Sequence, residues 1–191
     1  MRSTRFALAT LSAAVAIAAG CASRPFAIPP DVPATLRPPS GQVVFLRTFA
    51  SGFQIYECAA KPDQPSSYQW TFRAPEAQLM DRSGRLIGRH YAGPTWEAND
   101  GSSVTAEVTA RDPGPGAASI PWLLLTAKTP MGSGALSVTK SIQRVQTVGG
   151  VAPPEPCDAA NASTVARVPY TATYYFYRAA QQSISMAPQY R

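Results

Sequence analysis

The sequence predicts an all-β fold, a single-domain antiparallel β-sandwich or closed β-barrel with few or no helices. In several segments apolar residues alternate with polar residues at a period of two, which is the spacing of half-buried strands. Turn-forming residues separate these segments, and no window of about a dozen residues sustains the apolar stripe of an amphipathic helix. The pattern leaves both the sandwich and the barrel open.

The alternation is strict at residues 68–73 (YQWTFR) and 104–109 (VTAEVT), so each segment predicts a strand with one buried face. Residues 120–127 (IPWLLLTA) are apolar at both odd-numbered and even-numbered positions, which predicts a central strand covered on both faces. Residues 75–80 have room for a single helical turn. Further strands are predicted at residues 43–49, 53–58, 85–91, 136–145 and 168–177.

Four breaks separate the predicted strands. Residues 81–84 (DRSG) and 99–102 (NDGS) contain residues that accept positive φ, so they predict tight reversals between neighbouring strands. Residues 113–116 (PGPG) and 149–156 predict longer loops, because proline and glycine interrupt regular strands there. The β-domain is predicted at residues 42–178, which is a suitable length for one domain with its own core.

Residues 1–20 have the layout of a secretory signal peptide. Arg2 and Arg5 precede an apolar stretch of about 14 residues, which is shorter than the roughly 20 residues that a membrane-spanning helix needs. Residues 21–41 are rich in proline and predict an extended tether. The small and polar residues 179–191 predict a flexible tail.

The signal ends at residues 17–21 (IAAGC), which resemble the lipobox of bacterial lipoproteins, where the cysteine becomes the lipidated first residue after cleavage. Ala18 stands in the place of the usual leucine, and ordinary cleavage nearby without a lipid is the alternative. Ala22 follows Cys21 in place of an aspartate, and the resemblance then implies transfer to the outer membrane. We therefore expect an exported protein with lipid (palmitate) on Cys21, held at the outer membrane and facing the periplasm.

Cys58 and Cys157 remain once Cys21 is assigned to the lipid. An even number of cysteines in an oxidising compartment predicts a disulfide between them. The rival interpretation, a redox-active pair, lacks the C-x-x-C spacing that tunes a thiolate. The sequence therefore favours a structural bond.

The formal net charge of the chain is +6, and two of its basic residues, Arg2 and Arg5, lie in the predicted signal. The other basic residues are scattered along the chain, as they are on an ordinary solvated surface. Export and this scatter exclude nucleic acid as a routine partner. The membrane is instead an expected partner, through the lipid anchor.

A series of short motifs follows one another along the domain, with Trp70 and Cys157 between them. They are GFQIYEC (52–58), PEAQLMD (75–81), HYAGPTWEANDGS (90–102), IPWLLLTA (120–127), IQRVQTVGGVAP (142–153) and VPYTATYYFY (168–177). This combination resembles the family known as domain of unknown function 3455, here in an exported bacterial lipoprotein. The resemblance covers nearly all of the domain, and it implies no activity because the family has no assigned functional residues.

Residues 90–102 form the richest cluster of polar and flat side chains in the chain and include its only histidine. We predict a binding surface on this hairpin, because hairpin ends carried by a rigid sheet are frequent sites of recognition. In the competing structural interpretation, the tryptophan plugs the core and the acidic residues satisfy backbone groups or arginines. The candidate binding residues are His90, Tyr91, Trp96, Glu97 and Asp100.

Catalysis is the alternative interpretation of the same hairpin. Glu97, Asp100 and His90 would serve a hydrolase that acts on envelope or extracellular polymer, with the carboxylates flanking a sugar bond. A triad with Ser102 is less favoured, because this serine directly follows turn-forming residues. One histidine is too few for a catalytic zinc site, and residues 149–150 (GG) lack the spacing of a dinucleotide motif. No metal and no cofactor is therefore expected.

Aromatic residues are the other notable group. In the last predicted strand Tyr174 and Phe176 share one parity, while Tyr175 and Tyr177 share the other. Most aromatic side chains are expected in the core, and in a sandwich one of these pairs would be exposed as a flat stacking surface.

The leading functional prediction is a non-enzymatic envelope lipoprotein whose β-domain binds a protein, a glycan or a small apolar ligand. It is favoured because each group of residues that could be catalytic has a simpler explanation as part of a turn, a surface or the core. The hydrolase is the first alternative, and a structural stabiliser of the envelope is a further one. Convergence of polar side chains in a cleft would favour an enzyme, and an aromatic groove would favour binding.

Overall fold

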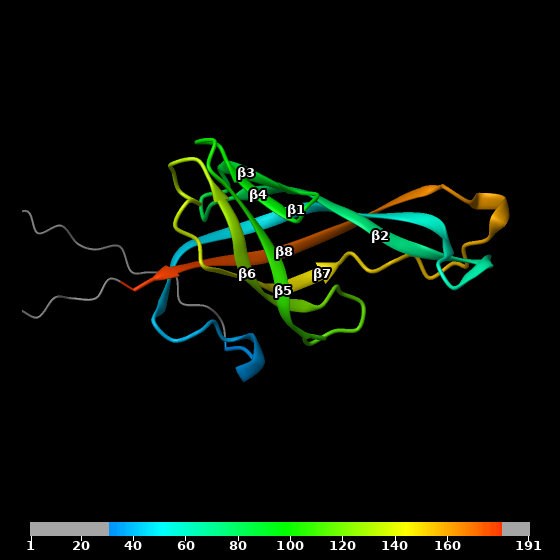
Figure 1. Ribbon diagram of the computed structural model, residues 1–191, viewed down its shortest axis with the longest axis horizontal. Coiled ribbons are helices and arrows are strands. Elements are labelled where there is room, and N and C mark those ends of the chain that lie inside the picture. The colour runs from blue at the N-terminus through cyan, green and yellow to red at the C-terminus, as the bar shows by residue number, and fades with distance from the viewer. Residues whose placement is uncertain (1–30, 181–191) are drawn as a thin grey trace, which may run out of the picture.

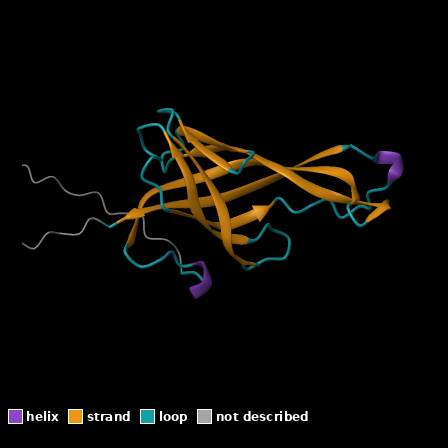
Figure 2. Cartoon of the chain, in the orientation of Figure 1, coloured by secondary structure: helices purple, strands orange, loops and turns teal. Residues whose placement is uncertain are grey.

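The computed structural model describes residues 31–180, which form a closed barrel of eight antiparallel strands (Figure 1 and Figure 2). Each strand pairs with the next one along the chain, and β8 pairs with β1 to close the barrel. This arrangement confirms the predicted all-β fold and selects the barrel over the sandwich. The strands are β1 (Gln42–Lys61), β2 (Gln64–Met80), β3 (Leu86–Tyr91), β4 (Thr95–Ala98), β5 (Ser103–Asp112), β6 (Trp122–Met131), β7 (Ser141–Gly149) and β8 (Val165–Ala179), and two short 3-10 helices are η1 (Ala34–Leu36) and η2 (Ala159–Asn161).

Strands β1, β2 and β8 are the longest, and they continue beyond the barrel as a three-stranded arm (Figure 1). The predicted disulfide between Cys58 and Cys157 lies on this arm, with the two Cα atoms 5.8 Å apart. Nearby, the indole N–H of Trp70 donates to the carbonyl oxygen of Glu155 at 3.0 Å. The disulfide thus ties the connection between β7 and β8 to the arm.

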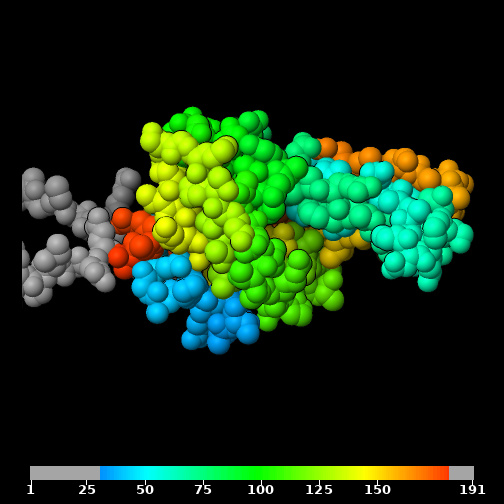
Figure 3. Space-filling view, viewed as in Figure 1, coloured from blue at the N-terminus to red at the C-terminus, as the bar shows by residue number. Residues whose placement is uncertain are grey.

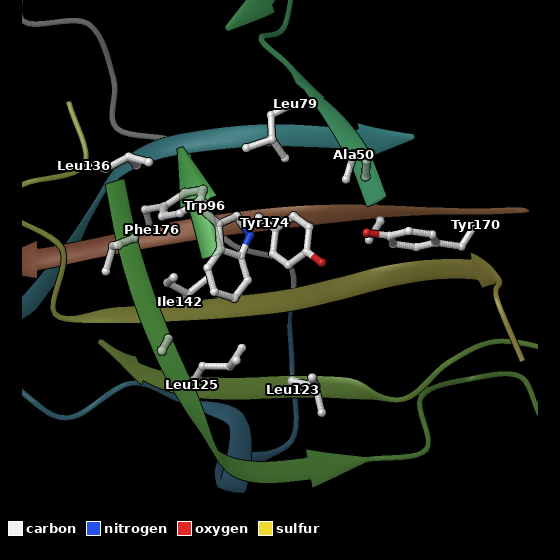
Figure 4. Close-up of a cluster of buried hydrophobic side chains, with 14 of the residues drawn as sticks. Ala50, Leu79, Trp96, Leu123, Leu125, Leu136, Ile142, Tyr170, Tyr174 and Phe176 are labelled. Atoms are coloured by element: carbon white, nitrogen blue, oxygen red, sulfur yellow. The ribbon is translucent and has the colours of Figure 1, made fainter. Parts of the chain in front are cut away.

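Side chains from alternate residues of each strand fill the barrel interior (Figure 4). Trp96 on β4 and Phe176 on β8 are buried there, with their ring centroids 6.4 Å apart in an edge-to-face arrangement. Leu79, Leu125 and Ile142 belong to the same buried cluster. The interior of the barrel is therefore a packed core at this level, and it supplies rigid walls for the cavity described below.

A second apolar cluster lies outside the barrel wall, beneath the segment that precedes β1. Figure 3 shows this segment, in blue, on the outside of the barrel. Leu36 of η1 belongs to it, together with Tyr175, Tyr177 and Leu124. The side-chain amide of Gln143 donates to the carbonyl oxygen of Leu36 at 2.8 Å and holds this segment in place. Both faces of β8 are consequently covered, so the exposed tyrosine pair expected for a sandwich does not occur.

This outer cluster revises the predicted tether. Leu36 is fully buried, so the described part of the predicted tether lies against the barrel and does not extend away from it. The cluster also confirms the strand predicted to be covered on both faces, since Leu123 and Leu125 face the interior and Leu124 faces outward. The predicted signal peptide, Cys21 and most of the predicted tail lie outside the described residues.

Strand β1 is continuous where two strands, at residues 43–49 and 53–58, were expected. Gly52 lies in the middle of β1, and a Cβ at this position would collide with the carbonyl oxygen of Glu76 on β2. The glycine therefore allows a close approach of two strands, and it does not break the strand. The helical turn expected at residues 75–80 is wrong, because this segment continues β2.

The strand expected at residues 136–145 begins only at Ser141, because the residues before it form a turn. Leu136 in this turn is buried in the interior cluster, which explains its apolar character. The two tight reversals occur where the sequence predicts them. Gly84 and Gly101 adopt φ angles of 82° and 83°, which favour glycine.

Candidate ligand-binding cavity

The five residues of the predicted binding surface are distributed over different faces of the barrel. His90 on β3 and Trp96 on β4 are direct partners across the two strands, and both side chains are buried in the interior. The neighbours of these residues, Tyr91 and Glu97, have the opposite parity and lie on the outer face. Asp100 lies in the turn between β4 and β5. The structure therefore brings only His90 and Trp96 together inside the barrel.

Tyr91 and Glu97 form a polar cluster with Arg89 on the outside. The Tyr91 hydroxyl donates to Glu97 Oε2 at 2.7 Å, and Arg89 Nη2 donates to both carboxylate oxygens at 2.9 and 3.0 Å. The hydrogen bond from Tyr91, and then that from Arg89, lowers the pKa of Glu97. Glu97 is thus an ionised carboxylate already occupied by two partners.

Asp100 has a structural role in the turn. Its Oδ1 accepts from the Ser102 hydroxyl at 2.6 Å, and its Oδ2 accepts from the backbone N–H of Ala135 at 2.7 Å. The Ser102 hydroxyl in turn accepts from the N–H of Leu136 at 3.0 Å. These bonds, with that from Ser102 first, lower the pKa of Asp100. Asp100 and Ser102 together fix the loop that carries Leu136 into the core.

His90 is enclosed by aromatic rings. It stacks on Trp96 with ring centroids 4.2 Å apart and an interplanar angle of 12°, and it meets the edge of Tyr174 at 5.3 Å. Its Nδ1 lies 2.8 Å from the carbonyl oxygen of Thr95, which can only accept, so Nδ1 carries the proton. Burial lowers the pKa of His90 to about 3. The imidazole is therefore neutral at physiological pH.

A cavity of about 280 Å³ opens beside these rings at the end of the barrel from which the arm extends. This volume is near the lower end of the roughly 300 to 1,000 Å³ of ligand pockets. Aromatic side chains form much of its wall, together with aliphatic residues of β5 and β6. The aromatic and polar side chains that line it are Gln54, Tyr56, Phe72, His90, Trp96, Arg111, Arg144 and Tyr174.

Several buried donors at this cavity have no hydrogen-bond partner among the described residues. They are Gln54 Nε2, Trp96 Nε1 and the Tyr174 hydroxyl, and each residue is no more than 2 % exposed. The Tyr170 hydroxyl, which is not part of the cavity lining, also forms no hydrogen bond of normal geometry, although it lies close enough to Tyr174 and Gln54 for these groups to act on its pKa. Figure 4 shows the Tyr170 and Tyr174 hydroxyls directed toward each other and the Trp96 nitrogen directed toward Tyr174. Burial raises the pKa of both tyrosines, so both hydroxyls keep their protons at physiological pH.

A family profile described as "Protein of unknown function (DUF3455)" matches residues 39–178, which span nearly the whole barrel and its arm. The chain belongs to this family. Comparison with curated proteins and comparison with solved structures give no match. The description of the DUF3455 family names no activity, so the chemistry of the cavity follows from its own side chains.

The cavity of this DUF3455 barrel is positively charged. Arg144 and Arg111 line it, whereas no aspartate or glutamate of residues 31–180 does. Arg144 donates through Nε and Nη2 to the carbonyl oxygen of Pro121, at 3.1 and 2.8 Å, and its remaining N–H groups are left for other acceptors near it, such as the Tyr174 hydroxyl. Neither arginine forms an ion pair with a carboxylate in the described part of the chain.

A larger hollow of about 750 Å³ lies on the outer face, across β1, β2, β3 and β8. The charged side chains that line it already have partners: Glu76 binds Arg167 at 2.8 Å, and Arg89 binds Glu97. The interior cavity combines enclosure with free donors, and the outer hollow is more open to solvent. The interior cavity is therefore the stronger candidate for a binding site in this DUF3455 domain.

Sequence reasoning missed Gln54, Arg144 and Tyr174 as members of a site. The parity of the strands held a usable signal, since Gln54 shares a face with Tyr56, and Arg144 shares a face with Ile142. A polar residue that alternates with core residues on one face of a strand points into the interior. The sequence analysis did not apply this rule to β1, β7 and β8, and it treated residues 90–102 as one surface, although their alternate side chains lie on opposite faces.

Proposed function

We propose that the barrel binds a small organic molecule in its interior cavity and does not convert it chemically. The observation that carries this proposal is the set of buried donors without partners at Gln54, Trp96 and Tyr174. A buried donor left without a partner costs about 1 to 3 kcal/mol, so an occupant with acceptor atoms would recover part of that cost. Of the protein, glycan and small apolar ligand expected from the sequence, the cavity supports a small ligand, but its arginines and buried donors suit a polar molecule and not an apolar one.

The walls of the cavity suit this function because they are already formed. Trp96 and His90 are held by their mutual stack, and Tyr174 packs edge-on against Trp96 at 5.5 Å. These side chains project from strands that pair on both sides, so the cavity needs little rearrangement to accept a ligand. Rigid flat walls and a few donors are the usual composition of a small-molecule site.

The hydrolase alternative has less support. Glu97 lies on the outer face in an ion pair, Asp100 fixes a turn, and the neutral ring of His90 is inside the barrel. A glycosidase needs two carboxyl groups that face one scissile bond. Because these three side chains point to different environments, we propose binding and not hydrolysis as the function.

The proposal is tested by calorimetric titration of the purified protein with trans-cinnamamide, a planar and uncharged probe with a carbonyl acceptor. We expect saturable binding to the parent protein. Val108→Phe places a ring in the cavity and should weaken binding at least about tenfold, and overpacking should lower its stability by about 1 to 3 kcal/mol. Val165→Phe, the same change at a residue that is 56 % exposed on the arm, is the matched control.

Thermal unfolding first establishes that both phenylalanine variants are folded. A parent protein that binds neither trans-cinnamamide nor its carboxylate analogue trans-cinnamate contradicts the proposal. So does a folded Val108→Phe variant that binds the probe as tightly as the parent, since the probe would then occupy another place.

We further propose that the protein is exported and carries a lipid on Cys21 that holds it to the bacterial envelope, at the outer membrane and facing the periplasm. The lipobox-like sequence at residues 17–21 supports the lipid. The disulfide between Cys58 and Cys157 fits an oxidising compartment outside the cytoplasm. No helix among the described residues is long and apolar enough to cross a membrane.

Mass spectrometry of the mature amino-terminal peptide tests the lipid directly. We expect an acylated Cys21 as the first residue, and we expect Cys21→Ser to move the exported protein from the membrane fraction to the soluble fraction. A mature amino terminus without lipid contradicts this proposal. Membrane attachment that survives the Cys21→Ser substitution does so as well.

A further inference from the structure

The chemistry of the cavity restricts the kind of molecule that fits it. We propose that the ligand is a small planar organic anion, with a carboxylate bound by Arg144 and a flat body that packs against the aromatic side chains of the lining. This inference rests on the proposed binding function and adds the chemical class of the ligand.

The charge of the cavity is the first argument. Arg144 and Arg111 bring two positive charges to the lining, and no carboxylate lines the cavity or pairs with either arginine in the described residues. The one histidine in the lining is neutral, because burial lowers the pKa of His90 to about 3. An anion would supply the countercharge that the lining lacks, whereas a cation would be repelled.

The position of Arg144 is the second argument. Arg144 lines the cavity together with Tyr56 and His90, and it is the direct partner of Tyr174 across β7 and β8. Its two bonds to the carbonyl oxygen of Pro121 fix its orientation. A guanidinium held in this way retains N–H groups for a carboxylate, the group with which arginine forms its strongest hydrogen bonds.

The free hydrogen-bonding groups are the third argument. The indole N–H of Trp96 can only donate, and the hydroxyl of Tyr174 and the side-chain NH₂ of Gln54 are also available as donors. A carboxylate has two oxygen atoms that only accept, so it matches a group of donors without bringing a donor of its own. A neutral amide offers one acceptor and adds two N–H groups that would need acceptors.

The aromatic walls select the shape of the body. The Trp96 and His90 rings are stacked, and Tyr56 and Phe72 meet edge-to-face at 5.7 Å near the cavity mouth. The two rings of each pair are in contact, so a ligand would lie against their free faces and edges, where a planar body makes more contact than a bulky aliphatic one. The volume of about 280 Å³ limits this body to a small molecule of one or two rings.

The experiment compares trans-cinnamate with trans-cinnamamide, which have nearly the same shape and differ in charge. We expect the parent protein to bind the carboxylate at least about tenfold more tightly, and we expect this preference to fall as salt is added. Arg144→Gln should reduce the affinity for cinnamate to that for the amide. Arg111→Gln should cause a smaller loss, because this side chain is exposed at the mouth.

Two further variants act as controls. Arg82→Gln removes an exposed arginine from the turn after β2, away from the cavity, and should leave both affinities unchanged. Arg144→Lys keeps the positive charge but lacks the planar guanidinium with its paired N–H donors, so it should retain part of the preference for cinnamate over cinnamamide. Thermal unfolding identifies any Arg144 variant that fails to fold, and the exposed Arg111 position then still tests the role of charge.

Each outcome has a defined meaning. Equal affinities of the parent protein for cinnamate and cinnamamide overturn the anion inference and leave the proposed binding function in place. A preference for cinnamate that persists in folded Arg144→Gln and Arg111→Gln also overturns it. If the parent protein binds neither probe, both this inference and the proposed function fail.

Discussion

Replacing Cys58 and Cys157 together by serine should lower the free energy of unfolding by about 4 to 5 kcal/mol in the chain-entropy model of disulfides. The two residues are 99 positions apart, so the bond closes a long loop in the unfolded chain and removes much of its freedom. A loss of this size is comparable to the whole net stability of a marginal domain. The effect is measured by equilibrium unfolding in denaturant, with the parent protein under reducing conditions as a second reference.

The structure also indicates which part of the protein should lose stability first in the double variant. Cys58 is 1 % exposed, and its backbone groups bond to Thr164 and Ser163 on the neighbouring chain segment at 2.9 and 2.8 Å. The arm should therefore loosen first, and the interior cavity should keep its probe affinity while the barrel is folded. Ser163→Ala, a single-atom change beside the bond, is the control. A stability change below about 1 kcal/mol in the double variant would contradict the assigned role of the disulfide.

Acid should destabilise the protein through His90 at a higher pH than through the carboxylates whose pKa values are lowered, which are Glu76, Asp81, Glu97 and Asp100. Burial lowers the pKa of His90 to about 3 in the folded protein, whereas an unfolded histidine titrates near 6.5. As the pH falls below about 6.5, the unfolded chain takes up a proton that the folded barrel does not, so the unfolded state is favoured. Linkage predicts a loss of about 2 kcal/mol between about pH 7.5 and about pH 5.

The chain contains one histidine, which makes the test specific. His90→Gln should be less stable than the parent at neutral pH because it loses the stack on Trp96. Its free energy of unfolding should not change with pH between about pH 7.5 and about pH 5. The depressed pKa values of Asp81, Glu97 and Asp100 shift their contributions to lower pH, outside this window. Equal slopes for the parent and His90→Gln would mean that His90 is not buried in neutral form.

The fold was predictable from local pattern to a large extent. Strict alternation identifies the strands around Tyr68 and Val104, and the double parity of residues 120–127 indicates a strand covered on both sides. Closure into a barrel was not predictable, because it depends on the pairing of β1 with β8, which are far apart in the chain. The alternation of side chains is the same in a sandwich and in a barrel.

The site was less predictable than the fold. The hairpin at residues 90–102 was a useful indication, since His90 and Trp96 line the cavity. Tyr91 and Glu97 lie on the outer face because successive side chains of a strand alternate between faces. Strand parity could have placed Arg144 in the interior, on the same face of β7 as Ile142, but not at this cavity, because its neighbours there come from other strands and no motif links them.

The indole resonances of the three tryptophans provide the most direct test of a ligand-binding interior. Trp96 Nε1 is a free donor at the cavity, Trp70 Nε1 is bonded to Glu155, and Trp122 belongs to the outer cluster. Nitrogen–proton correlation spectra recorded during a titration with trans-cinnamate report on all three at once, and Trp70→Phe and Trp122→Phe supply the assignments. We predict a large saturable shift of the Trp96 resonance with little change at Trp70 and Trp122. A Trp96 resonance that stays in place at saturating probe would contradict a binding site inside the barrel.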